Sequence, residues 1–139
     1  MTTTKCGSIM SEIGIGVIGG GYMGKAHSVA MSAVGAVFGT TLRPRLEMIA
    51  ATSTESAEHY RQSYGFKCAT NDWRILVDDD RVEAVIIASP QATHREIAER
   101  ALAAGKPVMC EKPMGASLAD SLAMVEAAEA AGVDKLVAY

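Results

Sequence analysis

Glycine recurs at short intervals near the start of this chain. The stretch GIGVIGGGYMG, residues 14–24, holds six glycines in eleven positions. It contains the spacing Gly-x-Gly-x-x-Gly twice, once as Gly14, Gly16 and Gly19 and once as Gly19, Gly21 and Gly24. Between a strand and a helix, this spacing allows a tight turn, close approach of a phosphate and close packing of the helix. The feature therefore predicts an α/β fold that begins with a strand.

The residues around the glycines favour the second register. Residues 12–18 are a short apolar run rich in Ile and Val, typical of a buried strand, and residues 22–34 place apolar side chains at helical spacing. The first register would instead leave Val17 and Ile18 in the phosphate loop. We expect Gly14 and Gly16 to stay in the strand, where the backbone packs closely. The expected cofactor-binding turn comprises Gly19, Gly21, Tyr22, Met23 and Gly24.

Strand and helix patterns alternate along the rest of the chain. Residues 35–45 are expected to form a long connecting loop. Further strands are expected at 46–52, 65–70, 83–89, 107–110 and 134–139, and further helices at 53–64, 71–79, 92–104 and 118–131. We predict a doubly wound Rossmann α/β fold, with a mostly parallel six-stranded sheet covered by helices on both faces.

Capping residues indicate where these helices begin and end. Thr52 and Glu55 have the spacing of a capping box, and Ser117 with Asp120 is expected to cap the last helix. The brief helix at 71–79 is capped by Asn71 or Asp72. The inner face of the helix at 92–104 is Ile97, Ala98, Ala101 and Leu102.

Length and charge exclude several classes of protein. The 139 residues suit one domain, which we place at 12–139 after a loose arm at 1–11. A net charge of −3 argues against general binding to nucleic acids or membrane surfaces, and no apolar run reaches the length of a membrane span. The three cysteines, an odd number widely spaced, predict neither a disulfide framework nor a metal site. Reduced thiols favour a cytoplasmic location.

A second group of residues lies at 88–113. Ser89-Pro90 and Glu111-Lys112-Pro113 follow two expected strands and therefore share the carboxyl edge of the sheet, where ligands bind in open α/β folds. Lys112 is placed to attract a substrate hydroxyl and assist proton movement. Its alternative role is that of a solvated lysine paired with Glu111. Cys110 resembles a nucleophile beside a lysine, but its place in an apolar strand favours a buried thiol.

With these residues, the chain resembles the Gfo/Idh/MocA oxidoreductases, the family of glucose–fructose oxidoreductase and inositol dehydrogenases. The resemblance covers the chain after residue 12 and rests on GVIGGGYMGKAH (16–27), ASPQATH (88–94), ALAAGKPVMCEKP (101–113) and LVAY (136–139). It implies an N-terminal NAD(P)-binding Rossmann domain and a C-terminal α/β substrate domain. It also implies hydride transfer between nicotinamide and a sugar, cyclitol or related polyol or keto substrate.

The resemblance assigns roles to particular residues. Lys112 matches the lysine near the family's catalytic centre, and Glu111 shapes its loop. The resemblance also implies that Glu111, Lys112 and His94 help to bind the cofactor. Ser89 and Pro90 match the segment that passes the ribose and nicotinamide, where the following residue is often Asn and is Gln91 here. His94 matches the family's histidine, with a buried structural role and a catalytic role both open. His27 is expected to serve packing.

The tip of the second strand bears on the choice of cofactor. NAD-selective domains carry Asp or Glu there, whereas this chain reads AATST over 50–54, with Ala51 at the usual acidic position. Thr52 and Ser53 can donate hydroxyl bonds to a 2′-phosphate, although Thr52 also has the capping role. We therefore expect NADP(H) to be favoured over NAD(H), with Arg43, Arg45 and Arg74 as candidate helpers.

Three functions compete. The first is the cofactor-binding domain of a sugar-type dehydrogenase, and the second is a non-catalytic module that senses NAD(P). The third, a methyltransferase, leaves the Glu-Lys-Pro segment without a role. The family's substrate domain normally follows residue 139 directly and is absent from this chain, so little catalysis is expected from these residues alone. The resemblance implies a homo-oligomer for the complete enzyme.

Overall fold

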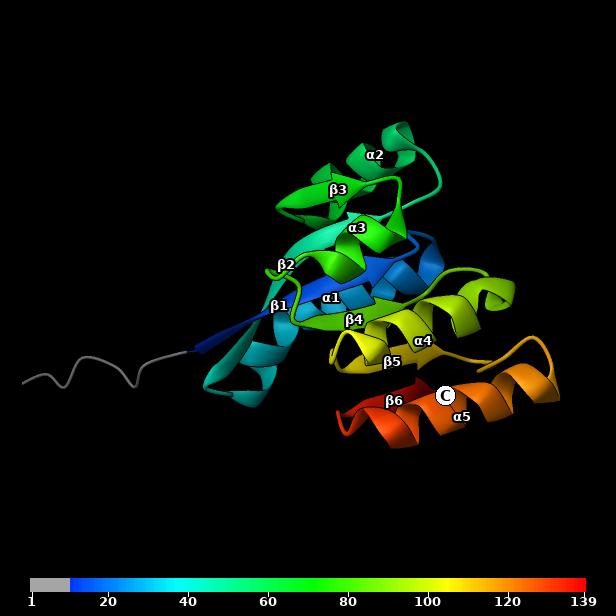
Figure 1. Cartoon of the computed structure of the whole chain (residues 1–139). Coiled ribbons are helices and arrows are strands. Elements are labelled where there is room, and N and C mark those ends of the chain that lie inside the picture. Colours follow the sequence, from blue (N-terminus) through cyan, green and yellow to red (C-terminus); the bar gives the residue numbers. More distant parts are fainter. Residues whose placement is uncertain (1–10) are drawn as a thin grey trace, which may run out of the picture.

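A single parallel sheet organises the molecule (Figure 1). The computed structural model describes residues 11–139. Its strands are β1 (Ser11–Ile18), β2 (Leu42–Ala50), β3 (Cys68–Thr70), β4 (Ala84–Ile87), β5 (Val108–Glu111) and β6 (Lys135–Ala138). Its α-helices are α1 (Tyr22–Phe38), α2 (Thr54–Tyr64), α3 (Trp73–Asp78), α4 (His94–Ala103) and α5 (Leu118–Ala131), with a short 3₁₀ turn, η1, at Gln91–Thr93.

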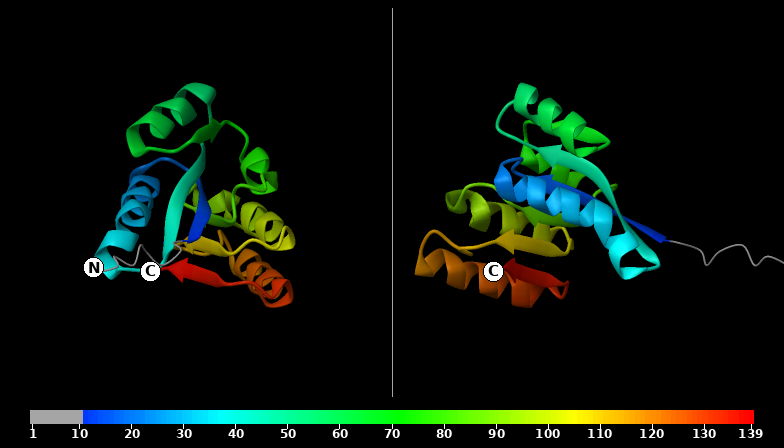
Figure 2. Two further views of the ribbon diagram at one scale, coloured as in Figure 1. Left: turned by 90° about the vertical axis from the view of Figure 1, so that its left-hand side faces the viewer. Right: turned by 180° about the vertical axis from the view of Figure 1, so that it is seen from behind.

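The order of the strands is that of a doubly wound fold. They lie as β3-β2-β1-β4-β5-β6, and each neighbouring pair is parallel. Helices α1 and α2 cover one face of the sheet, and α3, α4 and α5 cover the other (Figures 1 and 2). The predicted six-stranded Rossmann fold is confirmed. Because all strands run the same way, their carboxyl ends meet at one edge.

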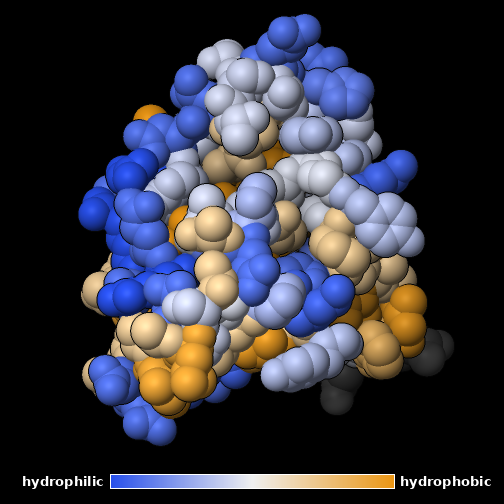
Figure 3. Space-filling model, turned by 90° about the vertical axis from the view of Figure 1, so that its right-hand side faces the viewer, coloured by the Kyte–Doolittle hydropathy of each residue, from blue (hydrophilic) through white to orange (hydrophobic). Residues whose placement is uncertain are grey.

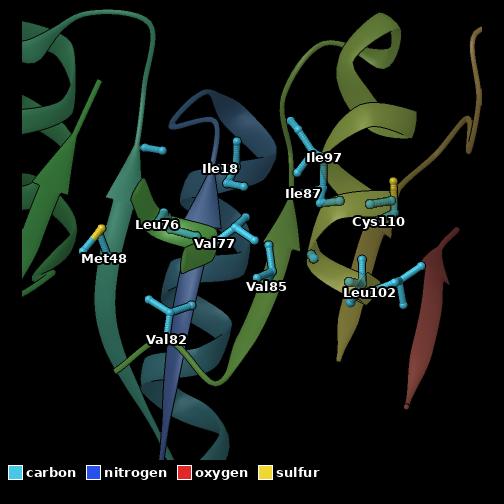
Figure 4. Packing of buried hydrophobic residues seen from close by; sticks show 14 of the residues in the cluster. Ile18, Met48, Leu76, Val77, Val82, Val85, Ile87, Ile97, Leu102 and Cys110 are labelled. Atoms are coloured by element: carbon cyan, nitrogen blue, oxygen red, sulfur yellow. The ribbon is translucent and has the colours of Figure 1, made fainter. Parts of the chain in front are cut away.

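The core consists of two layers, one on each face of the sheet. Side chains alternate in direction along a strand, so Val85 and Ile87 pack under α3 and α4 while Ile86 packs on the opposite face. The predicted inner face of α4 is confirmed, because Ile97, Ala98, Ala101 and Leu102 are all buried. Figure 4 shows this layer between the helices and β1, β4 and β5.

The predicted loop over 35–45 is wrong. Helix α1 continues to Phe38 and ends at Gly39, whose φ of 62° is the left-handed conformation of a glycine cap. Strand β2 begins at Leu42, although it contains Pro44. The proline is tolerated because β3 pairs only with residues 48–50 of β2, so the first half of β2 has one free edge.

Helix α2 begins differently from the prediction. Its cap is Ser53, whose hydroxyl accepts a hydrogen bond from the N–H of Ser56, so the capping box assigned to Thr52 and Glu55 is wrong. The predicted caps Asp72 and Ser117 are confirmed. The expected arm lies outside the described residues, apart from Ser11, which already belongs to β1.

Figure 3 shows the face of the molecule toward which the carboxyl ends of the strands point. Hydrophobic surface gathers in its lower half, at the height of α5 and β6. Exposed hydrophobic side chains of these elements and of the chain end are Leu118, Leu122, Val125, Leu136 and Tyr139. None of the helices that the structure describes is long and apolar enough to cross a membrane.

Candidate functional site

A cavity of about 740 Å³ opens at the carboxyl edge of the sheet. The glycine turn after β1, the tip of β2, the start of α3 and the loop after β4 surround it. Seven of the predicted site residues line it: Gly19, Gly21, Tyr22, Met23, Thr52, Ser89 and Pro90. Gly24, Ser53, His94, Glu111 and Lys112 do not line it.

The glycine turn has the geometry that the second register predicts. It lies between the end of β1 and the start of α1. Gly19 has a φ of 98°, and a Cβ there would lie 2.5 Å from the carbonyl oxygen of Ala88. A Cβ on Gly24 would collide with the carbonyl oxygen of Gly19. Both glycines are therefore required by the backbone around them.

Gly21 differs from these two, because apart from its chain neighbours and the adjacent helix backbone nothing lies within 4 Å of the position its Cβ would take. It is the N-cap of α1 and provides no side-chain cap. The first N–H groups of a helix have no partner within the helix, and the positive end of the helix dipole lies there. The turn thus offers open space, free donors and a positive potential, which together suit a phosphate group.

The loop after β2 and the first turn of α2 provide hydroxyl groups. Thr52 and Ser56 line the cavity, whereas the hydroxyl of Ser53 is engaged in capping α2. None of the residues lining this cavity carries a carboxylate. Ser56 was not predicted as a site residue, because a serine in the first turn of a helix has no sequence motif that marks it as part of a binding site.

Two of the three candidate arginines lie elsewhere. Arg43 and Arg45 both lie in the first half of β2. Arg43 packs beside Gly35 of α1, and the guanidinium of Arg45 donates a 2.7 Å hydrogen bond to the carboxylate of Glu47. The expectation that they assist at the β2 tip is therefore wrong. Arg74 alone lies near the cavity, since its guanidinium stacks 4.4 Å above the ring of Trp73, which lines the cavity.

Trp73 and Asn71 extend the cavity beyond the tip of β2. Asn71 directly follows β3 and Trp73 begins α3, so the chain's single tryptophan lies at the carboxyl edge of the sheet. The sequence pattern predicted only a brief helix for this segment. An aromatic residue directly after a strand of an α/β fold is the signal that could have identified it. Tyr60 of α2, which also lines the cavity, was missed as well.

His94 connects the two loops on the other side of the site. It is 2% exposed, and its Nε2 lies 2.9 Å from the carbonyl oxygen of Ser89. Its Nδ1 lies 3.1 Å from the carbonyl oxygen of Pro113. The side-chain amide of Gln91 donates to the carbonyl of Gly115 and links the same loops. Of the two roles left open for His94, this geometry corresponds to the buried, hydrogen-bonded one.

His27 and Glu111 hold the backbone of Lys112. Glu111 ends β5 and is 7% exposed, and its Oε1 lies 2.6 Å from His27 Nε2. Its Oε2 accepts a hydrogen bond of 3.2 Å from the N–H of Lys112. The alternative in which Glu111 pairs with the ammonium of Lys112 does not match this structure. His27 therefore has a polar partner as well as a packing role.

Cys110 is a buried thiol, as the apolar strand around it indicated. It is 3% exposed, and burial raises its pKa to about 11, with a smaller contribution from the neighbouring Glu111. The thiolate needed for nucleophilic attack is thus disfavoured at neutral pH.

The fold and the glycine turn define a nucleotide-binding Rossmann domain. Residues 13–139 match the family model described as the oxidoreductase family with an NAD-binding Rossmann fold. The chain belongs to this family, the Gfo/Idh/MocA oxidoreductases, and binds a nicotinamide dinucleotide through this domain.

Curated relatives of this chain include dehydrogenases of sugars and cyclitols. Levoglucosan dehydrogenase of Pseudarthrobacter phenanthrenivorans is 38% identical over 131 residues, which cover 94% of this chain and 34% of that protein. Inositol 2-dehydrogenase 2 of Saccharopolyspora erythraea is 35% identical over 81% of this chain and 32% of that protein. The chain spans about a third of the length of the curated relatives it matches.

Solved structures show the same relationship. Levoglucosan dehydrogenase in complex with NADH superposes with a TM-score of 0.89 at 37% identity, covering 91% of this chain and 34% of that chain. An NAD-binding oxidoreductase from Klebsiella pneumoniae gives a TM-score of 0.88 at 38% identity, covering 92% and 34%.

Proposed function

We propose that this chain is the cofactor-binding domain of a dehydrogenase that transfers hydride between nicotinamide and a sugar, cyclitol or related polyol or keto substrate. The observation that carries the proposal is the open space at Gly21 within a cavity built by the turn after β1. Levoglucosan dehydrogenase, a relative with this fold, is described in complex with NADH and levoglucosan. The dinucleotide would supply the hydride acceptor or donor.

The residues of the cavity suggest how the dinucleotide lies. The pyrophosphate would meet the turn from Gly19 to Gly24, and the adenosine ribose would lie at Thr52 and Ser56. The ring of Trp73 offers an apolar face on which the adenine could stack. Ser89 and Pro90 would face the nicotinamide end, and the ammonium of Lys112 would hold a substrate hydroxyl and assist its proton transfer.

Binding of the dinucleotide is testable through the chain's only tryptophan. Titration with NADPH should quench the fluorescence of Trp73 and produce energy transfer to the nicotinamide. Gly21→Val should abolish both signals, because its side chain would occupy the space for the pyrophosphate. Energy transfer of equal strength in Gly21→Val would contradict the proposed site.

We also propose a preference for NADP(H). The cavity lining carries hydroxyls at Thr52 and Ser56 and no carboxylate. A carboxylate at the tip of β2 would bind the ribose of NAD and repel a 2′-phosphate. The nearby guanidinium of Arg74 adds positive potential, although it also pairs with Glu96 at 2.6 Å. NADPH should therefore bind more tightly than NADH.

Ser53→Asp tests this preference through charge alone. Asp keeps the cap of α2, because it caps helices as well as Ser, and its negative charge lies next to Thr52 of the cavity lining. The ratio of the NADPH and NADH dissociation constants should shift by about tenfold toward NADH, the effect of about 1.4 kcal/mol. Ala51→Asp should shift it in the same direction. Tighter binding of NADH by the unmodified chain would refute the preference.

A non-catalytic module that senses NAD(P) remains the competing function. Lys112 separates the two, because a sensor does not need its ammonium group at the carboxyl edge. In the full-length product of the gene, Lys112→Ala should leave dinucleotide binding intact and strongly reduce hydride transfer. A full-length product that binds cofactor and reduces or oxidises no polyol or keto sugar would favour the sensor.

A further inference from the structure

The middle glycine of the turn, Gly20, is not required by the Gly-x-Gly-x-x-Gly spacing, yet two tyrosines of α2 contact it. The hydroxyl of Tyr64 donates a hydrogen bond of 2.8 Å to the carbonyl of Gly20. The ring of Tyr60 covers Gly20 so closely that a Cβ there would collide with it. The two rings stack, with centroids 5.5 Å apart. Helix α2 therefore holds one peptide group of the turn from outside.

The direction of that peptide group follows from its geometry. Within residues 11–139 the only cis peptide bond is Lys112–Pro113, so the bond between Gly20 and Gly21 is trans. In a trans peptide the C=O and the N–H point in opposite directions. Tyr64 does not line the cavity, whereas Gly20 and Gly21 do. With the carbonyl of Gly20 held toward Tyr64, the N–H of Gly21 points away from α2.

The N–H of Gly21 is also free to bind a ligand. No hydrogen bond in the described part of the chain is donated by this group. The space beside it is open, as the position of the absent Cβ shows. A phosphate oxygen in the turn could therefore accept a hydrogen bond from it.

The phenol of Tyr64 is suited to a constant donor role. Burial raises its pKa, and the neighbouring Tyr60 raises it further. The hydroxyl thus stays protonated through the neutral and mildly alkaline range. The ring of Tyr60 packs against it and fixes its orientation.

We propose that Tyr64 is a positioning residue for pyrophosphate binding. Its hydroxyl holds the Gly20–Gly21 peptide in the orientation that presents the N–H of Gly21 to the pyrophosphate. The inference rests on the proposed function, in which this cavity binds a dinucleotide. It assigns Tyr64 an effect on ligands that contain pyrophosphate and none on adenosine alone.

The test compares ligands with and without pyrophosphate on the 139-residue chain. Tyr64→Phe keeps the stacked ring and removes only the donor. The dissociation constants of ADP and NADPH should rise about three- to tenfold, as expected for one lost hydrogen bond. The dissociation constant of adenosine, followed by Trp73 fluorescence, should stay unchanged. The control Tyr139→Phe removes a hydroxyl from a fully exposed ring and should leave the dissociation constants of all three ligands unchanged.

A purely structural role for Tyr64 gives a different result. Loosening of the whole cavity would weaken ADP and adenosine by the same factor, and that outcome would overturn the proposal. Unchanged binding of ADP by Tyr64→Phe would also overturn it. A second measurement needs no variant: on titration of the unmodified chain with ADP, the amide proton of Gly21 should show a large downfield NMR shift. An unshifted Gly21 amide would refute the proposal even if Tyr64→Phe failed to fold.

The same experiment separates this inference from the function on which it rests. If the unmodified chain binds neither NADPH, NADH nor ADP, the proposed cofactor site fails and the role of Tyr64 fails with it. If the unmodified chain binds these ligands and Tyr64→Phe binds them equally well, only the role of Tyr64 fails.

Discussion

The glycines of residues 14–24 differ in what surrounds them. A Cβ on Gly14 would collide with the carbonyl oxygen of Arg81, and one on Gly16 would lie 2.6 Å from the side chain of Leu76. These two glycines serve the packing of β1. Gly21 alone within this stretch has open space where its side chain would be. The packing of the fold therefore does not require the missing side chain of Gly21, which agrees with the proposed phosphate site.

Gly21→Val should abolish dinucleotide binding and lower the stability of the domain only slightly, because Val is a poorer N-cap than Gly. Its backbone angles, φ −66° and ψ −161°, are extended and acceptable for valine. The added side chain would fill the space of the pyrophosphate. Calorimetry should show no binding heat with NADPH, and the melting temperature without ligand should stay within a few degrees of the unmodified chain.

Ala30→Val is a suitable control, since Ala30 is exposed on α1 and lies outside the cavity lining. It should bind NADPH normally. Gly14→Ala does not serve as a control, because the collision with Arg81 is expected to lower stability. If Gly21→Val binds NADPH as tightly as the Ala30→Val control, the pyrophosphate does not bind beside Gly21 and the proposed site is wrong.

Cys110 should resist alkylation in the folded protein. Its pKa of about 11, raised by burial from an ordinary 9.0, means that the folded state favours the neutral thiol. The resulting stabilisation is complete below about pH 9 and is lost as the pH rises toward 11. Iodoacetamide at pH 8 followed by peptide mass spectrometry should leave Cys110 unmodified, and denaturant should expose it. Rapid labelling of Cys110 in the native protein would contradict its burial.

At the scale of the elements, the register of the pair β1–β2 shifts by one residue. Ile15 pairs with Leu46 and Gly16 with Met48, so Glu47 is the extra residue of a β-bulge. Glu47 is 2% exposed. Its carboxylate accepts a 2.7 Å hydrogen bond from Arg45 and lies 3.7 Å from the ammonium of Lys67 and 3.8 Å from the guanidinium of Arg81. The bulge therefore holds a buried carboxylate among three cations.

Glu47→Ala should destabilise the domain by about 2 kcal/mol, because it removes charge-assisted hydrogen bonding from a buried position. The matched control is Glu12→Ala, which removes the second, 58% exposed carboxylate of the same Arg45. An exposed pair contributes about 0–1 kcal/mol. Urea unfolding of both variants measures the difference, and equal losses would contradict a structural role for the bulge.

At the scale of the whole molecule, binding and catalysis make different demands. The turn after β1, the tip of β2 and the loop after β4 all lie around one cavity, and the proposed contacts with the dinucleotide are made there. The chain spans about a third of its relatives' length. Holding a substrate close to the nicotinamide can contribute about 7–11 kcal/mol to catalysis. Lys112 alone offers one charged group for that task.

We therefore expect the 139-residue chain to bind a dinucleotide and to turn over little or no substrate. Its melting temperature should rise with added NADPH, because a ligand that binds only the folded state stabilises it. Polyols and keto sugars should produce no steady change in nicotinamide absorbance. Turnover at a rate usual for dehydrogenases, in a preparation free of longer enzyme, would contradict this division.

The parts of the fold that were predictable are those decided by local pattern. The apolar runs of β1 and β4, the inner face of α4 and the cap at Ser117 depend on neighbouring residues, and the structure matches them. The choice between the two glycine registers also needed only the flanking strand and helix. The predicted bounds of α1 and β2 were wrong. For β2 the reason is that the short β3, far along the chain, leaves a free edge beside Pro44.

The sequence by itself determined the doubly wound fold, the turn from Gly19 to Gly24 and the loop that bears Lys112, since each depends on spacing along the chain. Only the tertiary structure decided which distant residues meet them. Tyr64 reaches Gly20, His27 reaches Glu111, and Trp73 joins the cavity, each across long stretches of sequence. Such contacts depend on how helices pack on the sheet, and no periodicity in the sequence records them.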